Sequence, residues 1–188
     1  SVKWRTDYTA ELSPGPLDIG FDYHFSVPSN HGDLTGIFVE NRYVYGLRSG
    51  KIPEGMRIAG PAADDDHFKT TYGPEDTERG KNEEKILPVD APRRKNERVM
   101  KVLTDKATHW LESQPKDKPF FLYFTPVAVH NPVTPDTDLA GKSAAGLYGD
   151  WIHELDRSVG RILETLDKMG ASKNTLVLFT SDNGGERF

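Results

Sequence analysis

The sequence has 188 residues, of which 36% are hydrophobic and 28% charged, and its formal net charge is -5 at pH 7. This length is enough for one domain with a substantial hydrophobic core. Because cysteine is absent, these residues exclude disulfides, cysteine-ligated metal sites and a thiol nucleophile. The 29 acidic residues outnumber the 24 basic ones, which argues against nucleic-acid binding. No apolar run is long enough to span a membrane.

The first half of the chain is rich in turn signals. Residues 36–45 predict two short strands around the turn at Glu40-Asn41-Arg42. From Lys51 to Pro92 the composition changes to Pro, Gly, Asp, Lys and Glu without clear periodicity, which predicts a loop-rich insert within the domain. The acidic run Asp64-Asp65-Asp66 suggests either a metal site or a solvated loop. Three adjacent carboxylates cannot all converge on one ion, so we interpret the run as a solvated loop.

The second half is more regular. Pro92 is suited to the first turn of a helix, and apolar residues then recur at three- and four-residue steps. Residues 120–124 form a continuous apolar, aromatic run that predicts a strand buried on both faces. Apolar positions from Leu147 to Met169 predict a long helix that ends at Gly170. Residues 175–180 predict a second buried strand.

This order of strand, helix and strand predicts a βαβ unit with parallel strands. The sequence therefore favours an α/β fold with a mainly parallel sheet flanked by helices. The carboxyl ends of parallel strands meet at one edge of the sheet, where α/β proteins bind their ligands. One of the loops at this edge carries His130, and the other carries Asp182 and Asn183. We predict a functional site there.

Asp182 and Asn183 offer two hard oxygen ligands of the kind that Ca²⁺ and Mg²⁺ prefer, and Gly184-Gly185 lets the backbone pass close by. The same four residues are also typical of a plain turn. Two ligands cannot fill a shell of roughly six to eight oxygens, so other ligands are expected from elsewhere.

His130 has two interpretations. Its imidazole can donate to an anionic oxygen or protonate a leaving group, or it can pack or cap locally. The other histidines that we considered, His31, His109 and His153, are weaker candidates. No pair among them has the spacing of metal ligands.

Three stretches of the sequence resemble the sulfatase family: KPFFLYFTPVAVHNP, GKSAAGLYGDWIHELDRSVGRILETLDKMG and NTLVLFTSDNG. Members of this family share a strand ending in His-x-Pro, a Gly-Lys-Ser…Tyr-Gly-Asp entry to a long helix, and a strand ending in Ser-Asp-Asn-Gly. The order and spacing of the three stretches agree with the family. The segment Gly20–Phe25 also resembles the Gly-Phe-Asp segment of the family.

The resemblance implies hydrolysis of a sulfate ester on a sulfated small molecule or glycan, by a formylglycine made from cysteine or serine and with Ca²⁺ in support (Mg²⁺ is the alternative). Asp182 and Asn183 correspond to the later half of the metal site. His130 corresponds to the histidine that contacts the sulfate and assists the leaving oxygen. Asn30 falls near a position where relatives place a sulfate-contacting serine.

The resemblance also implies that residues 1–188 are a partial catalytic domain, an incomplete alkaline-phosphatase-like fold. The family places a metal-binding Asp-Asp pair and the nucleophile before the Gly-Phe-Asp segment, so we expect both outside this chain. Ser26-Val27-Pro28-Ser29-Asn30 has the spacing of the nucleophile motif, but Asn30 and Ile37 stand at its arginine positions. We therefore interpret Ser26 as a loop residue and expect the isolated chain to be inactive.

Other expectations concern location and class. No signal peptide is recognisable in the opening residues, and the resemblance implies a periplasmic or secreted parent protein. The oligomeric state stays open. Two alternative functions also stay open. One is a phosphatase, phosphodiesterase or phosphonate monoester hydrolase of the same superfamily, and the other is a noncatalytic anion- or glycan-binding module.

Overall fold

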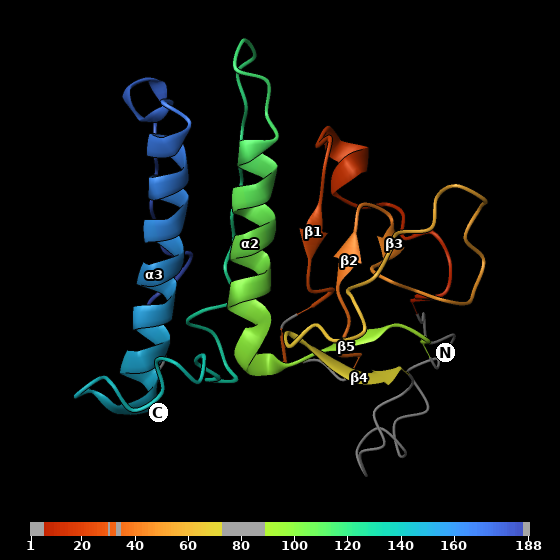
Figure 1. The fold of residues 1–188 in the computed structure, drawn as a ribbon, viewed down its shortest axis with the longest axis horizontal. Coiled ribbons are helices and arrows are strands. Elements are labelled where there is room, and N and C mark those ends of the chain that lie inside the picture. The colour runs from red at the N-terminus through yellow and green to blue at the C-terminus, as the bar shows by residue number, and fades with distance from the viewer. Residues whose placement is uncertain (1–5, 30, 33–34, 73–88, 186–188) are drawn as a thin grey trace. The chain divides into compact units, whose positions relative to one another are not determined.

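A computed structural model describes residues 6–29, 31–32, 35–72 and 89–185 of the chain (Figure 1). The chain forms two compact units, Ser1–Val99 and Met100–Phe188. The elements in chain order are η1 (Pro16–Ile19), β1 (Phe25–Ser26), β2 (Val39–Glu40), β3 (Tyr43–Val44), β4 (Phe68–Tyr72), β5 (Pro92–Arg94), η2 (Asn96–Arg98), α2 (Val99–Glu112), α3 (Gly146–Lys168) and η3 (Ser172–Asn174).

The first unit contains a three-stranded antiparallel sheet in the order β1-β2-β3. The turn between β2 and β3 includes Asn41, whose φ of 54° is in the left-handed region that asparagine tolerates. The side-chain oxygen of Asn41 accepts a hydrogen bond from the backbone N–H of His24 at 3.1 Å. The strand pair predicted around residues 40–42 is confirmed.

Two apolar groups hold the first unit together. A buried cluster joins residues that are far apart in the sequence, namely Ile37, Val44, Leu47, Val89 and Ala91. An aromatic group lies on the strands, where Phe38 stacks on Phe25 at a centroid distance of 5.1 Å and meets Phe68 edge-on at 5.9 Å. The Phe68 ring connects β4 to this sheet. The first unit is therefore stabilised by contacts between distant segments.

The predicted helix start at Pro92 is wrong. Pro92 begins β5, which pairs antiparallel with β4 and places Lys69 opposite Arg93. α2 begins seven residues later, at Val99. A proline lacks the N–H that a strand would donate, so it is tolerated at the start of β5 as well as at a helix start. The described part of the insert, residues 51–72 and 89–92, thus contains a strand, and residues 73–88 lie outside the description.

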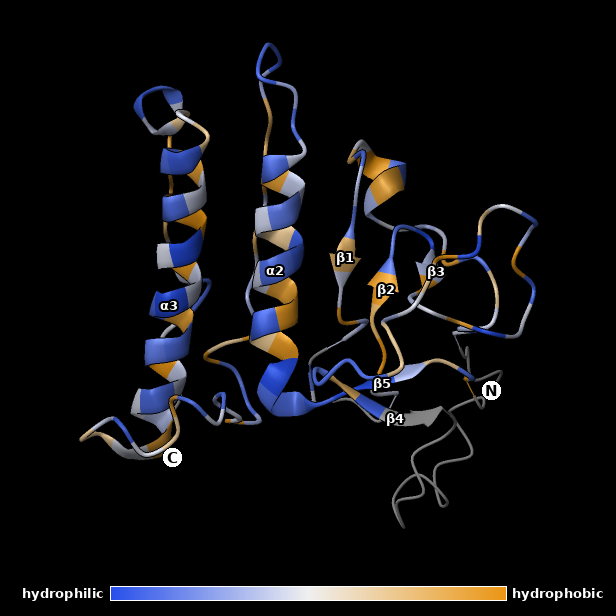
Figure 2. Cartoon of the chain, viewed as in Figure 1, coloured by the Kyte–Doolittle hydropathy of each residue, from blue (hydrophilic) through white to orange (hydrophobic). Residues whose placement is uncertain are grey.

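The two helices of the second unit agree with the predicted periodicity. α3 ends at Lys168, and Gly170 follows with a φ of 72°, the left-handed conformation that glycine adopts after a helix. Trp151 and Leu166 are buried on one side of α3. Figure 2 shows hydrophilic residues over much of the face of α3 toward the viewer.

The predicted buried strands at residues 120–124 and 175–180 are not seen. Neither segment is assigned to a strand, and Phe121 and Leu178 are 72% and 84% exposed. A strand buries its side chains only within a sheet that is covered on its faces, and the sheets formed by the described residues lie elsewhere and are antiparallel. The described residues contain helices and sheets, but they do not form the mainly parallel sheet that we predicted.

Candidate functional site

The His130 loop presents one nitrogen of an exposed imidazole. His130 Nδ1 lies 2.7 Å from the backbone oxygen of Asn131. A carbonyl oxygen only accepts hydrogen bonds, so this contact assigns a proton to Nδ1. Nε2 is then the nitrogen available to a ligand. It accepts a hydrogen bond when the ring is neutral and donates one when the ring is protonated.

The backbone of His130 is held by a buried tryptophan on α3. Trp151 is 0% exposed, and its indole N–H donates to the His130 carbonyl oxygen at 3.1 Å. The ring also belongs to a buried cluster with Met100 and Ala128, against which Val129 packs. Trp151 therefore contacts the loop through apolar packing and through one directed hydrogen bond.

A second residue of α3 holds the loop further along. The buried carboxylate of Asp150 accepts hydrogen bonds from the backbone N–H groups of Gly141, Lys142 and Ser143 at 2.7, 3.0 and 2.6 Å. Burial raises the pKa of Asp150, but the three donors outweigh it, and the pKa lies below its ordinary value of 3.8. A Cβ at Gly149 would lie only 2.1 Å from Ser143 Oγ. This packing explains the Gly-Lys-Ser…Gly-Asp pattern physically.

A third contact involves two buried carboxylates. Glu154 Oε2 accepts a hydrogen bond from the backbone N–H of Asp136 at 2.6 Å. Arg157 Nη2 lies 3.4 Å from a carboxylate oxygen of each acid. Burial raises the pKa of Glu154 above its ordinary value of 4.5. Asp150, Trp151 and Glu154 thus bind the backbone of the preceding loop at three separate places.

The second candidate loop has the geometry of a polar turn. Ser181 Oγ donates to the Asn183 carbonyl oxygen at 2.6 Å, and Asn183 Nδ2 donates to the Gly184 carbonyl oxygen at 2.8 Å. Since the amide nitrogen is used within the turn, Oδ1 is the Asn183 atom suited to a ligand role. Asp182 and Asn183 are both exposed.

These oxygens fit part of a divalent-cation site. Carboxylate and amide oxygens are the donors that Ca²⁺ and Mg²⁺ prefer, and both side chains are accessible. Within the described ranges, however, no group of three or more His, Cys, Asp or Glu side chains is arranged to hold a metal ion. The assignment of Asp182 and Asn183 as metal ligands therefore stays a prediction.

The two loops lead toward the same end of α3. Figure 1 shows the chain turning back after α2 and again after α3. The segment after α3 therefore runs toward the end at which the His130 loop enters that helix. The predicted meeting of the two loops at a sheet edge stays a prediction, because the described residues form no sheet there.

The remaining candidate, Asn30, lies outside the described residues. The next residue, His31, is 0% exposed, and its carbonyl oxygen accepts hydrogen bonds from Arg94 Nη2 at 3.0 Å and Nε at 3.3 Å. Arg94 also donates to the Ile37 carbonyl oxygen. Its neighbour Arg93 donates to the carbonyl oxygens of Thr35 and, at 2.7 Å, Val89. Two buried arginines of β5 therefore hold the backbone that follows position 30.

Two features considered from the sequence have structural roles. Asp65 accepts from His67 at 2.6 Å, and Asp66 pairs with Lys95 at 3.0 Å and Arg98 at 3.2 Å. These contacts agree with a solvated, ion-paired loop. Ser26 is part of β1, opposite Val39 of β2, where it is a strand residue rather than the loop residue that we expected.

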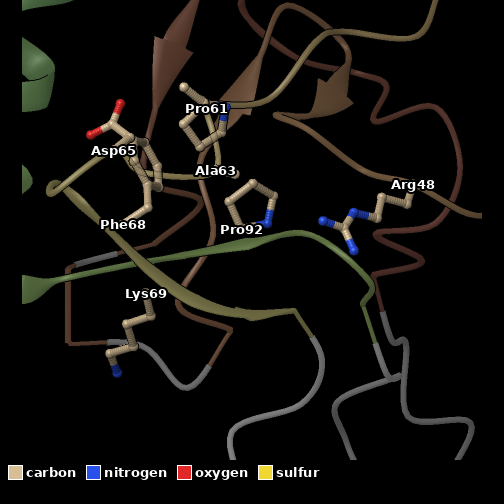
Figure 3. A pocket seen from close by; sticks show the side chains of 8 residues that line it. Arg48, Pro61, Ala63, Asp65, Phe68, Lys69 and Pro92 are labelled. Carbon is tan, nitrogen blue, oxygen red and sulfur yellow. The ribbon is translucent and has the colours of Figure 1, made fainter.

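A hollow of about 220 Å³ lies in the first unit, apart from all predicted site residues (Figure 3). Its lining combines apolar side chains with charged ones, namely Arg48, Pro61, Ala62, Ala63, Asp65, Phe68, Lys69 and Pro92. Figure 3 shows Asp65 and Lys69 pointing in different directions. Binding sites for small molecules usually combine apolar walls with polar groups that converge. The Asp65 and Lys69 side chains do not converge, so this hollow lacks that feature of a binding site.

Sequence reasoning missed the residues that hold the candidate loops. The apolar pattern from Leu147 to Met169 places Trp151 on one helix face and indicates nothing more, and no sequence signal pointed to Arg94. One signal was present for α3: Asp150 and Glu154 are four residues apart, next to the apolar positions Trp151 and Leu155. Carboxylates beside an apolar stripe are either exposed at its border or buried with dedicated donors.

A model of the family named Sulfatase matches residues 39–188. The chain belongs to the sulfatase family. It is 34% identical to an N-acetylgalactosamine-6-O-sulfatase of Bacteroides thetaiotaomicron over 97% of the chain and 37% of that protein. It is also 51% identical to the N-acetylgalactosamine-6-sulfatase of Rattus norvegicus over 37% of the chain and 13% of that protein.

The fold also resembles a solved structure. That structure is described as concerning the metabolism of multiple glycosaminoglycans by Bacteroides thetaiotaomicron, and it matches with a TM-score of 0.66 and 28% identity. The match covers 90% of the chain and 37% of the solved structure. The chain therefore spans 37% of the length of each Bacteroides thetaiotaomicron protein, and its match covers 13% of the rat protein. Within the described residues, no helix is both long and apolar enough to cross a membrane.

Proposed function

We propose that this chain is part of a sulfuric-ester hydrolase that acts on a sulfated glycan. The observation that carries the proposal is the His130 loop, in which Nδ1 is bonded to the Asn131 carbonyl oxygen and Nε2 is left for a ligand. Family membership and relatives named as N-acetylgalactosamine-6-sulfatases support the sulfate ester and the sugar.

In the proposed reaction, His130 acts on the ester oxygen that leaves the sulfate. A protonated imidazole donates from Nε2 to this oxygen as the S–O bond breaks, so the sugar leaves as a neutral hydroxyl group. The bond from Nδ1–H to the Asn131 carbonyl oxygen holds the ring orientation during this transfer. Asn30 is proposed as a further contact to the sulfate oxygens.

Asp182 and Asn183 are proposed to hold a Ca²⁺ ion, with Mg²⁺ as the alternative, through Oδ atoms exposed at the second loop. When bound, the ion supplies positive charge that stabilises the sulfate oxygens. The nucleophile is proposed to be the formylglycine that the family resemblance implies, carried by another part of the parent protein. The same resemblance supports a periplasmic or secreted location for that protein.

We also propose that residues 120–124 and 175–180 become neighbouring parallel strands of an alkaline-phosphatase-like sheet in the complete domain. Their exposed side chains support this proposal, because Phe121, Tyr123, Leu178 and Phe179 are each at least 69% exposed. Large apolar side chains left exposed in this way often mark an area covered by another part of a protein. On this proposal, residues 1–188 are part of one catalytic domain.

The test uses the full-length parent protein with two matched substrates, 4-nitrophenyl sulfate and 4-nitrophenyl phosphate, and with 6-O-sulfated N-acetylgalactosamine. We expect sulfate release from both sulfate esters. For the 6-O-sulfated sugar, whose leaving oxygen needs a proton, kcat should fall about 100-fold in His130→Ala, the contribution typical of a general acid. His109→Ala, an exposed position on α2, is the control and should keep its activity. Preferential hydrolysis of the phosphate ester, or full activity of His130→Ala, would overturn the proposal. Ligand binding without hydrolysis would favour the noncatalytic module.

A further inference from the structure

We propose that Trp151 is a positioning residue for His130, and this inference rests on the proposed role of His130 in sulfate-ester hydrolysis. Trp151 does not touch the substrate in this scheme. Its indole N–H holds the His130 carbonyl oxygen at 3.1 Å, and the backbone held in this way determines where the imidazole points.

Two hydrogen bonds act at opposite ends of the same residue. The Trp151 N–H binds the carbonyl oxygen of His130, and the carbonyl oxygen of Asn131 binds its ring Nδ1. The first bond restrains the backbone between residues 130 and 131, and the second restrains χ1 and χ2 of the imidazole. The Asn131 carbonyl oxygen belongs to the next peptide group along the chain after the one that Trp151 holds. Loss of the indole N–H therefore releases the His130 backbone and also the acceptor that holds the ring.

Burial restricts the motion of the Trp151 side chain. The ring is 0% exposed and packs with Met100 and Ala128, while Val129 and Leu155 border the same cluster. His130 itself is exposed. Without a hydrogen bond to hold it, its side chain could change rotamer in the solvent. A rigid donor from the helix core therefore compensates for the exposure that substrate access requires.

The requirement is for the N–H group as well as for the ring. Phenylalanine would fill part of the cluster but would leave the His130 carbonyl without its donor. Trp110 provides a comparison because its partly buried ring also makes an apolar contact in this unit, edge-on to Phe120 at a centroid distance of 6.2 Å. Replacement of either tryptophan removes an indole, but only the Trp151 indole binds the candidate loop.

The experiment measures the full-length parent protein with Trp151→Phe, Trp151→3-benzothienylalanine and the control Trp110→Phe. Benzothienylalanine has the shape of tryptophan with sulfur in place of N–H, so it separates the hydrogen bond from the packing. For both Trp151 variants we expect kcat for 6-O-sulfated N-acetylgalactosamine to fall about 10- to 100-fold, as expected when a proton donor is displaced. KM should change less than about threefold. The control should keep the kcat of the wild type.

A second readout does not depend on activity. The ¹⁵N shifts of the His130 ring report its tautomer, and we expect protonated Nδ1 in the neutral ring of the wild type and a mixture in the benzothienylalanine protein. An unchanged kcat and an unchanged tautomer in that protein would overturn the proposal and leave Trp151 as a packing residue. If the wild type hydrolyses no sulfate ester, the proposed function fails, and the tautomer still decides the role of Trp151.

Discussion

Gly149→Ala tests the packing between α3 and the loop before it. A Cβ at this position would lie 2.1 Å from Ser143 Oγ and 2.8 Å from Ser143 Cβ. Ordinary carbon contacts are about 3.5 to 4.0 Å, so the two elements would have to separate. Ser143 cannot withdraw freely, because its N–H is bonded to Asp150 at 2.6 Å.

The expected magnitude is a balance of two effects. Replacing glycine by alanine inside a helix stabilises it by about 0.5 to 1 kcal/mol. Inserting a methyl group into a packed contact costs about 1 to 3 kcal/mol. We therefore expect Gly149→Ala to lower the free energy of unfolding by about 1 kcal/mol. Gly160→Ala in the same helix has no atom within 4 Å of the new Cβ, so it should stabilise the protein by about 0.5 to 1 kcal/mol.

Urea unfolding followed by circular dichroism measures this difference of about 2 kcal/mol, and thermal unfolding should show a gap in Tm of about 4 to 8 °C. Ser143→Gly combined with Gly149→Ala removes both close contacts and should recover part of the loss. Equal stability of Gly149→Ala and Gly160→Ala would refute the reasoning, because the helix effect alone would then explain both variants.

Three further predictions concern buried or paired charges. Arg94→Lys should destabilise the protein by about 3 kcal/mol in urea unfolding. Arginine reaches the His31 and Ile37 carbonyl oxygens from three separate nitrogens, and lysine has only one. Equal stability would show that the carbonyls are satisfied otherwise. Hydrogen bonds, from Arg42 first and then from Gly15, hold the pKa of Asp18 at about 2 instead of 3.8. The contribution of Asp18 to the free energy of unfolding should therefore decrease as the pH falls from 3.8 to 2. Asp18→Asn should remove this part of the pH dependence. Burial raises the pKa of Glu154 above 4.5. Its contribution to the free energy of unfolding should therefore decrease as the pH rises above 4.5. If the free energy of unfolding had the same slope against pH in Glu154→Gln as in the wild type, this prediction would be contradicted.

Local pattern was sufficient for several elements. The periodicity of apolar residues predicted α3 and its end at Gly170, and the turn formers around Asn41 predicted the strand pair β2–β3. These features depend on residues within one turn of helix or one hairpin, so a short stretch of sequence carries the information. The family resemblance also identified His130 as the candidate residue whose loop the structure shows in detail.

Contacts between distant residues were decided only by the tertiary structure. Pro92 became a strand residue because β4 pairs with β5, and residues 120–124 and 175–180 formed no strand because no partner strand lies beside them among the described residues. The sequence determined the chemistry of the His130 loop, an imidazole after an apolar segment. Only the folded chain placed the Trp151 N–H against its carbonyl oxygen, since a hydrogen bond across 21 residues leaves no local pattern.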